Sequence, residues 1–309
     1  MWNSNLFVEL RRRHLAGNLP KSCLECELRN SGEKYYEQFD SGCISSIARQ
    51  NLERNKIEYF RGDIFLHSLP VTLSVDLLYE CNFSCMLCSL RFRKDRISDR
   101  HCAELFHDLA IFAAHLHVSG GEPFLDTRFI QFLKSETVPA LSLSITTNGS
   151  LLDNEILEDL KRFPCINLHI SVDSFNPELF AQLRNGPLGL ENIIEKIRMT
   201  RSVLQKPSNN DQVSKLHIAL QFIPLAKNLT EIPSYILKAR DLSVDEIGVC
   251  RLDSYYPEHD PADFLRKWSQ DQRDTLFREL YEALGSSSGV ETYKLEVYMA
   301  ELLRELQNE

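Results

Sequence analysis

Residues 71–88, VTLSVDLLYECNFSCMLC, decide the fold of this chain. The first seven are rich in apolar and β-branched residues, which is typical of a strand. Three cysteines, Cys81, Cys85 and Cys88, follow directly after it. Thiolate sulfur is a soft ligand that suits iron–sulfur clusters and zinc. The stretch therefore predicts a metal-binding loop at the carboxyl end of a strand.

Strand-like and helix-like segments alternate from residue 71 onward, which indicates βαβ units and a parallel sheet. The expected strands are Val71–Leu77, Leu116–Ser119, Leu141–Thr146, Ile166–Val172, Leu216–Ile223 and Glu246–Cys250. Helices are expected near Ser98–Ala114, Thr127–Lys134, Asn154–Phe163, Leu190–Leu204 and Leu229–Arg240. Six units fall short of a complete eight-fold barrel, and a doubly wound sheet also fits the alternation alone.

A zinc site is the main alternative for the cysteine loop. Structural zinc takes four protein ligands, whereas this segment supplies three. Cys102 could be a fourth ligand, but it lies inside a predicted helix. Three thiolates would instead leave one iron of a four-iron cluster open to a substrate or cosubstrate. The local sequence therefore favours an iron–sulfur cluster with an open iron.

Polar or glycine-rich segments end the next three predicted strands. They are Ser119–Pro123 (SGGEP), Thr146–Gly149 (TTNG) and Ser171–Asp173 (SVD), and Arg184 follows on the next element. Adjacent glycines permit close approach of a ligand, and the planar fork of arginine matches a carboxylate. Taken singly, these residues could equally cap helices or form surface ion pairs. Because ligands bind at the carboxyl ends of parallel strands, their joint position favours a binding site.

The Cys-x3-Cys-x2-Cys spacing and the strand-end motifs, in this order, resemble the radical S-adenosylmethionine (SAM) superfamily. The resemblance covers roughly residues 71–255 and implies an α/β fold, a partial (β/α)6 TIM-like barrel. It implies a [4Fe–4S] cluster held by Cys81, Cys85 and Cys88, whose open iron binds SAM. Family members cleave SAM reductively to a 5'-deoxyadenosyl radical, which abstracts hydrogen from a substrate.

The resemblance also implies which residues contact SAM. The turn at residues 120–123 would contact its amino group, and Ser171 and Arg184 would hold its carboxylate. The residue before the third cysteine is usually aromatic and lies against the adenine, whereas this chain has Leu87. The stretch Phe222–Glu231 resembles the fifth-strand exit of members that carry auxiliary clusters. The residues implied to bind the cofactor are Leu87, Gly120, Gly121, Glu122, Pro123, Asn148, Ser171, Asp173, Arg184 and Gln221.

The chain is expected to have three parts. Residues 1–68 do not follow the alternation and form a small cysteine-containing unit, residues 69–255 form the barrel, and residues 256–309 form C-terminal helices. The tail after Asp260 predicts two helices, separated near residues 285–289.

Three cysteines precede the barrel. Cys23 and Cys26 form a Cys-x2-Cys pair, and Cys43 follows. The segment Trp2–Cys26 resembles the auxiliary-cluster region, of the SPASM or twitch type, of peptide- and sugar-modifying family members. Cys23, Cys26 and Cys43 could bind an auxiliary iron–sulfur cluster, bind zinc in a structural knuckle, or bind no metal.

The remaining cysteines have less specific signals. Cys250 ends the sixth predicted strand. It could act catalytically by returning a hydrogen atom to a substrate radical, complete the auxiliary site, or pack in the core. Cys102 and Cys165 are expected to be core residues.

Composition narrows the class of protein. The chain has 309 residues and a net charge of −9, which leaves no electrostatic footprint for wrapping nucleic acid. It has neither a long apolar stretch nor the apolar core of a signal peptide, so we expect a cytoplasmic protein without a membrane partner. In a reducing compartment, cysteines are expected to be metal ligands, catalytic thiols or buried residues rather than disulfides.

The resemblance implies an oxidoreductase or epimerase that requires an electron donor such as flavodoxin or ferredoxin. The first substrate hypothesis is a ribosomally made peptide that is cross-linked, oxidised or epimerised during natural product biosynthesis. The second is a sugar or other small natural-product intermediate. A non-catalytic iron–sulfur protein is the alternative outside enzymes, and the strand-end motifs argue against it.

Overall fold

The computed structural model describes residues 3–19, 36, 39, 42–90, 92–135, 140–207, 214–250 and 259–307. Cys23 and Cys26 lie outside the described residues, so the predicted N-terminal metal site is not tested by the structure.

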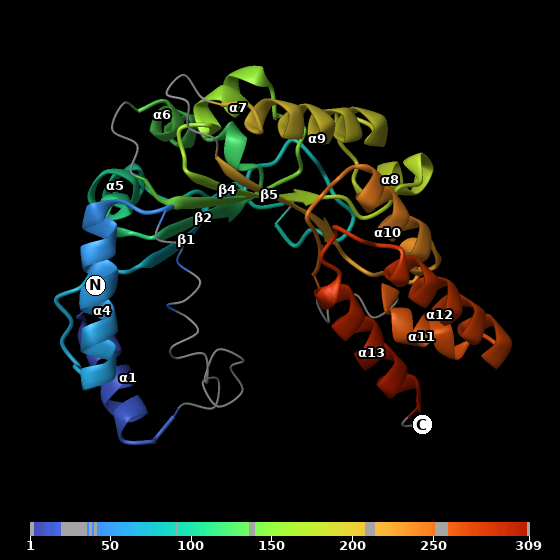
Figure 1. Ribbon diagram of the computed structural model, residues 1–309, viewed down its shortest axis with the longest axis horizontal. Helices are drawn as coiled ribbons and strands as arrows, with labels where there is room; N and C mark the ends of the chain where they lie inside the picture. Colours follow the sequence, from blue (N-terminus) through green and yellow to red (C-terminus); the bar gives the residue numbers. More distant parts are fainter. Residues whose placement is uncertain are drawn as a thin grey trace.

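A six-stranded parallel sheet forms the centre of the fold (Figure 1). The strands are β1 (Thr72–Leu78), β2 (His115–Gly120), β3 (Ser142–Thr147), β4 (Cys165–Ser171), β5 (Lys215–Phe222) and β6 (Glu246–Val249). They lie side by side in sequence order, and each pairs with the next in parallel. This order excludes the doubly wound sheet, in which the strand order reverses at a switch point. The predicted partial (β/α)6 barrel, open between β1 and β6, is confirmed.

Helices cover the outer face of the sheet, where α6, α7 and α9 lie together (Figure 1). Their bounds are α5 (Asp99–Ala103), α6 (Thr127–Lys134), α7 (Asn154–Leu160), α8 (Pro177–Leu183), α9 (Leu190–Leu204) and α10 (Ile232–Asp241). A π-helical turn at Glu104–Leu109 and a 3-10 turn at Ala110–Phe112 continue α5. No helix was predicted at α8, which begins with a proline after the capping residue Asn176.

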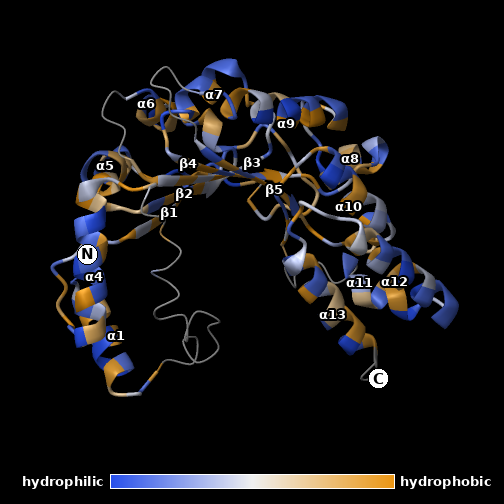
Figure 2. Cartoon of the chain, viewed as in Figure 1, coloured by the Kyte–Doolittle hydropathy of each residue, from blue (hydrophilic) through white to orange (hydrophobic). Residues whose placement is uncertain are grey.

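Alternation along the strands separates the core from a polar concave face. Leu116 and Val118 of β2 are fully buried against the helices, and so are Leu143 and Ile145 of β3. Because successive side chains point to opposite faces, the intervening His117 faces the concave side. Figure 2 shows both hydrophobic and hydrophilic residues around the outer helices, as expected for helices that cover a core with one face.

Among the residues that the structure describes before the barrel, α1 (Asn5–Leu15) and α4 (Ser46–Arg61) are helices. The Asn51 amide of α4 donates hydrogen bonds to the carbonyls of Leu69 and Phe112, at 3.0 Å each. These bonds fix α4 to the segments that lead into β1 and β2.

Cys43 forms a disulfide with Cys165, the first residue of β4. The pairing corrects the prediction that Cys43 is a metal ligand, because a disulfide sulfur is not available as a thiolate. It also corrects the expectation that Cys165 is a lone core residue and that the chain lacks disulfides. The two cysteines are 122 residues apart in the sequence, so no local pattern indicates their contact.

The C-terminal segment forms three helices rather than two: α11 (Pro261–Arg266), α12 (Gln270–Gly285) and α13 (Tyr293–Gln307). The additional break arises because Ser269 and Gln272 form a capping box that starts α12 anew. The predicted separation near residues 285–289 is confirmed. Across the described ranges, no helix has the length and apolar character needed to span a membrane.

Candidate active site

A single pocket lies at the carboxyl ends of the strands and gathers most of the predicted site residues. It is formed by the cysteine loop, by the ends of β2, β3 and β4, and by the loop after β5. Its lining residues are Tyr79, Cys81, Phe83, Cys85, Leu87, Cys88, Leu90, Gly120, Gly121, Thr146, Thr147, Asn148, Ser171, Asp173, Leu183, Arg184, Ile223 and Leu225.

Hydrogen-bond donors surround the sulfurs of the cysteine loop. The Phe83 backbone N–H donates to Cys81 Sγ at 3.4 Å, and the Asn148 amide donates to the same sulfur at 3.7 Å. Arg184 Nη1 donates to Cys85 Sγ at 3.9 Å. Cys81, Cys85 and Cys88 form no disulfide. These donors stabilise negative charge on sulfur, and they oppose the burial that raises the pKa of Cys81 and of Cys85.

Two glycines allow the cysteine loop to approach the end of β2. A Cβ atom on Gly120 would lie 2.3 Å from the carbonyl oxygen of Leu78, and one on Gly121 would lie 2.0 Å from that of Glu80. Gly120 also has a φ of +126°, which L side chains rarely adopt. The Gly121 N–H donates to the Leu78 carbonyl at 2.7 Å. The glycines therefore fix the backbone immediately before Cys81.

Glu122 and Pro123 are buried and do not line the pocket, and their expected contact with the cofactor stays a prediction. The Glu122 carboxylate accepts hydrogen bonds from Thr147 Oγ1 and from the Asn148 backbone N–H, both at 2.8 Å. Its oxygens are thus occupied by β3 and the turn that follows. Glu122 positions Asn148, which in turn reaches the sulfur of Cys81.

Replacing Glu122 tests this positioning role. Burial raises the pKa of Glu122 to about 7, so the folded protein holds a proton that the unfolded chain releases near pH 4.5. This carboxyl contributes stability below pH 4.5, and that contribution is lost as the pH rises towards 7. Relative to the wild type, Glu122→Gln should therefore gain stability as the pH rises through this range, as measured by urea unfolding. If the stability of Glu122→Gln and that of the wild type changed in parallel with pH, the raised pKa of Glu122 would be contradicted.

Glu122→Ala should lower the free energy of unfolding by about 1–3 kcal/mol, because it leaves the buried donors of Thr147 and Asn148 without an acceptor.

Arg184 and Asp173 form a buried ion pair in the pocket wall. Arg184 Nε lies 2.6 Å from Asp173 Oδ2, and their side chains are 12% and 8% exposed. Asp173 Oδ1 also accepts a hydrogen bond from the Ile223 backbone N–H at 3.0 Å. The pair joins the end of β4 to the exit of β5 and presents the guanidinium beside Cys85 and Ser171.

Asn228 supports the same wall and was not assigned a role from the sequence. It is fully buried, and its amide donates to the carbonyls of Asp173 and Ile223, at 2.7 and 2.9 Å. Its side-chain oxygen accepts from the Leu225 backbone N–H at 2.7 Å. The sequence did contain a signal for this role, because Asn228 lies within Phe222–Glu231, the stretch that resembles the fifth-strand exit of some family members.

Gln221 and Cys250 lie outside the pocket lining. The Gln221 amide nitrogen lies 2.9 Å from His169 Nδ1, and the Cys250 thiol donates to the Gln221 amide oxygen at 3.0 Å. The Gln221 side chain therefore bonds to its neighbours on the concave face, and its expected cofactor contact stays a prediction. Cys250 is exposed, and desolvation by the surrounding chain raises the pKa of its thiol.

Histidines line the concave face beneath the pocket. Burial lowers the pKa of His115 and that of His169 to about 4 each, so both are neutral at pH 7. His117 Nε2 lies 3.0 Å from Thr146 Oγ1, a pocket residue. The concave face thus offers neutral hydrogen-bonding groups next to the site.

Residues 77–210 match the family model of the radical SAM superfamily. The curated relatives include the "Probable GTP 3',8-cyclase" of Methanocaldococcus jannaschii, 26% identical over 182 residues that cover 55% of each chain. They also include the "Mycofactocin maturase MftC" of Mycobacterium ulcerans, 27% identical over 128 residues that cover 40% of this chain and 35% of the maturase. The chain thus spans about half the length, or less, of these relatives.

Solved structures share the fold. Streptococcus suis SuiB bound to S-adenosylmethionine aligns with a TM-score of 0.54 and 16% identity, covering 77% of this chain and 53% of SuiB. SuiB bound to its precursor peptide SuiA aligns with a TM-score of 0.51 and 15% identity, covering 92% and 60%.

The family match covers the cysteine loop and the strand ends whose side chains meet in the pocket, so this part of the chain is similar to the radical SAM superfamily. The cofactors of this family are a [4Fe–4S] cluster and SAM. The residues present fit both groups. Three thiols share one pocket with amide and guanidinium donors, and a buried arginine lies beside them.

Proposed function

We propose that this chain is a radical SAM enzyme that modifies a ribosomally made peptide. The observation that carries the enzymatic part is the convergence of Cys81, Cys85 and Cys88 with the strand-end residues in one pocket. A sensor or storage protein would need the thiols but not the arginine and polar groups beside them. When bound, the cluster and SAM supply a carbon radical that abstracts hydrogen from an unactivated position.

The protein's own residues would bind the cluster, orient SAM and shield the reacting atoms from water. Cys81, Cys85 and Cys88 hold the cluster, with the Asn148 amide donating to the first sulfur. Arg184 receives the SAM carboxylate, because its planar guanidinium is already oriented by Asp173. Leu87 and other apolar residues of the lining exclude water from the reacting atoms.

Cys250 is the proposed source of the hydrogen atom that a substrate radical recovers in an epimerisation. The thiyl radical left on Cys250 would then take one electron from the external electron donor and a proton from solvent, which restores the thiol. Its thiol is protonated and donates to Gln221, which ties it to the concave face below the pocket. An oxidation or cross-link would not require this residue, so the net outcome depends on whether Cys250 is used.

The peptide substrate is supported by two names among the relatives. One curated relative is a mycofactocin maturase, and SuiB has been solved with its precursor peptide. Other relatives are named as a GTP 3',8-cyclase and an AdoMet-dependent heme synthase, which makes GTP a useful comparison substrate.

The test is the formation of 5'-deoxyadenosine by anaerobically reconstituted, reduced protein given SAM. We expect product above a control without reductant, and more when a short peptide encoded beside this chain is added. No product from a cluster-loaded sample would overturn the enzymatic proposal. Stimulation by GTP but not by the peptide would overturn the peptide proposal alone.

A further inference from the structure

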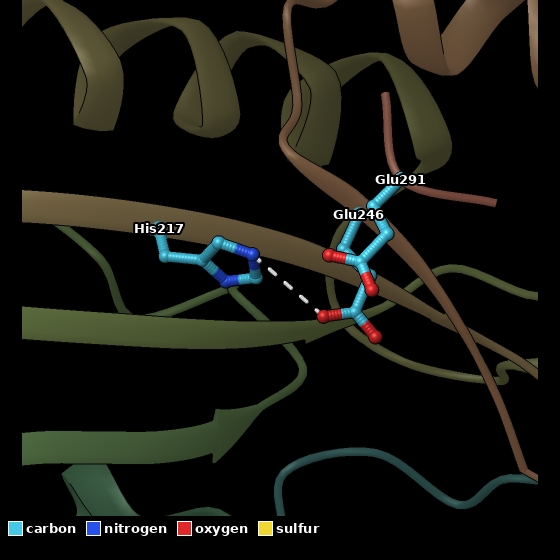
Figure 3. Close-up of side chains that lie close together, drawn as sticks. All are labelled: His217, Glu246 and Glu291. Carbon is cyan, nitrogen blue, oxygen red and sulfur yellow. Dashed lines mark ion pairs between the residues drawn. The ribbon is translucent and has the colours of Figure 1, made fainter. Parts of the chain in front are cut away.

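A second group of potential metal ligands lies away from the cysteine pocket. The side chains of His217, Glu246 and Glu291 each offer one ligand atom, and these atoms all lie within 4.8 Å of one another. Figure 3 shows the imidazole ring of His217 facing the two carboxylates. His217 Nε2 is 3.7 Å from Glu246 Oε2. We propose that these three residues bind a divalent transition-metal ion of the Zn²⁺ or Mn²⁺ type.

The backbone holds the three residues in place. His217 is on β5 and Glu246 begins β6, which pair in parallel. Glu291 forms a parallel bridge with Glu246. The Glu291 N–H donates to the backbone carbonyl of Asp245 at 2.7 Å, and the Ile247 N–H donates to the Glu291 carbonyl at 2.9 Å. The ligands therefore come from three adjacent, hydrogen-bonded segments, which is the rigid support that a metal site needs.

The strand alternation places this group on the concave face. Ile218 and Ile247 are fully buried towards the helices, so His217 and Glu246 point to the opposite side. The charges of Glu246 and His217 both act on the pKa of His169, which lies on the same face. The proposed ion would therefore lie on the concave face of the sheet, the face that also carries His169.

The charges at the group favour a cation. The Glu246 side chain is only 10% exposed, and Lys294 Nζ lies 2.6 Å from its Oε1 atom. That oxygen makes no hydrogen bond of acceptable geometry. Two carboxylates against one ammonium leave a net negative charge at the group. Lys294 is 54% exposed, so it can withdraw when a divalent ion replaces its charge.

The donor set selects the class of ion. Imidazole nitrogen with two carboxylate oxygens suits Zn²⁺, Fe²⁺ and Mn²⁺, whereas a soft metal would prefer the cysteine loop. Three protein ligands leave a coordination position for water or a substrate oxygen, as in catalytic rather than structural zinc sites.

The test is Mn²⁺ binding to the cluster-loaded full chain, followed by electron paramagnetic resonance and by displacement with Zn²⁺. Mn²⁺ is chosen because it prefers oxygen and nitrogen to thiolate. We expect one saturable site, weakened at least about tenfold in His217→Gln and in Glu291→Gln. Glu282→Gln on α12 is the matched control and should bind as the wild type does.

The variant Lys294→Met tests whether the lysine ammonium and the metal ion compete for Glu246. If the ammonium competes with the ion for Glu246, removing it should strengthen Mn²⁺ binding several-fold. Weaker binding in Lys294→Met, equal binding in His217→Gln and Glu282→Gln, or no saturable binding would each overturn the proposal. The measurement does not depend on SAM cleavage, so it stands apart from the proposed function.

Discussion

Replacing Cys81, Cys85 and Cys88 together with alanine is expected to remove the cluster and to reduce 5'-deoxyadenosine formation to background. The three sulfurs are the only cysteines that line the pocket in the described part of the chain. Iron–sulfur clusters are held by thiolates, so a loop without them has no anchor for iron. Iron and sulfide analysis after reconstitution measures the first effect, and chromatography of the reaction measures the second.

Cys102→Ala is the matched control for this experiment. Cys102 is buried in α5 and does not line the pocket, so its loss should leave both iron content and turnover near wild type. Turnover that persists in the triple variant would refute the assignment of the loop. Residual iron of about four atoms per chain in that variant, without turnover, would support a second cluster that includes Cys23 and Cys26 among its ligands.

The second large effect is expected at Arg184. Arg184→Met should weaken SAM binding by roughly 10- to 100-fold, because a charge-assisted hydrogen bond to a carboxylate contributes about 1.5–3 kcal/mol. It should also destabilise the fold by about 3–5 kcal/mol, because Asp173 is left charged and buried without its partner. Equilibrium dialysis with SAM and urea unfolding measure the two effects separately.

A double variant separates binding from stability. Arg184→Met with Asp173→Asn removes the unpaired charge and keeps an acceptor for the Ile223 N–H, so much of the lost stability should return. SAM affinity should stay low in the same protein. Arg184→Lys keeps the charge but not the planar fork and should fall between the wild type and Arg184→Met. SAM affinity that recovers together with stability would show that Arg184 only supports the fold.

The sequence was sufficient for the sheet because its signals are local. Each strand is a short apolar run between polar segments, and all six were placed to within one or two residues. The cysteine loop and the strand ends were equally clear, because parallel strands place their carboxyl ends at one edge. Short elements were harder: α8 has seven residues and was not predicted.

The features that could not be predicted depend on contacts between distant residues. Cys43 and Cys165 are far apart in the sequence, and their contact depends on how α4 docks on the barrel. Glu122 was expected at the cofactor because its motif contains it, yet its carboxylate turns to Thr147 and Asn148. The same holds for His217, Glu246 and Glu291, which no motif connects.

The contact between the double glycine and the segment before Cys81 also bears on how the protein would acquire a cluster. Because backbone hydrogen bonds and close packing hold that segment against β2, its position is set by the folded polypeptide rather than by bound iron. Cluster insertion then needs rearrangement of a few residues instead of a folding transition, unlike in zinc fingers, which are unfolded without metal. We therefore expect the polypeptide to fold before iron and sulfide are delivered.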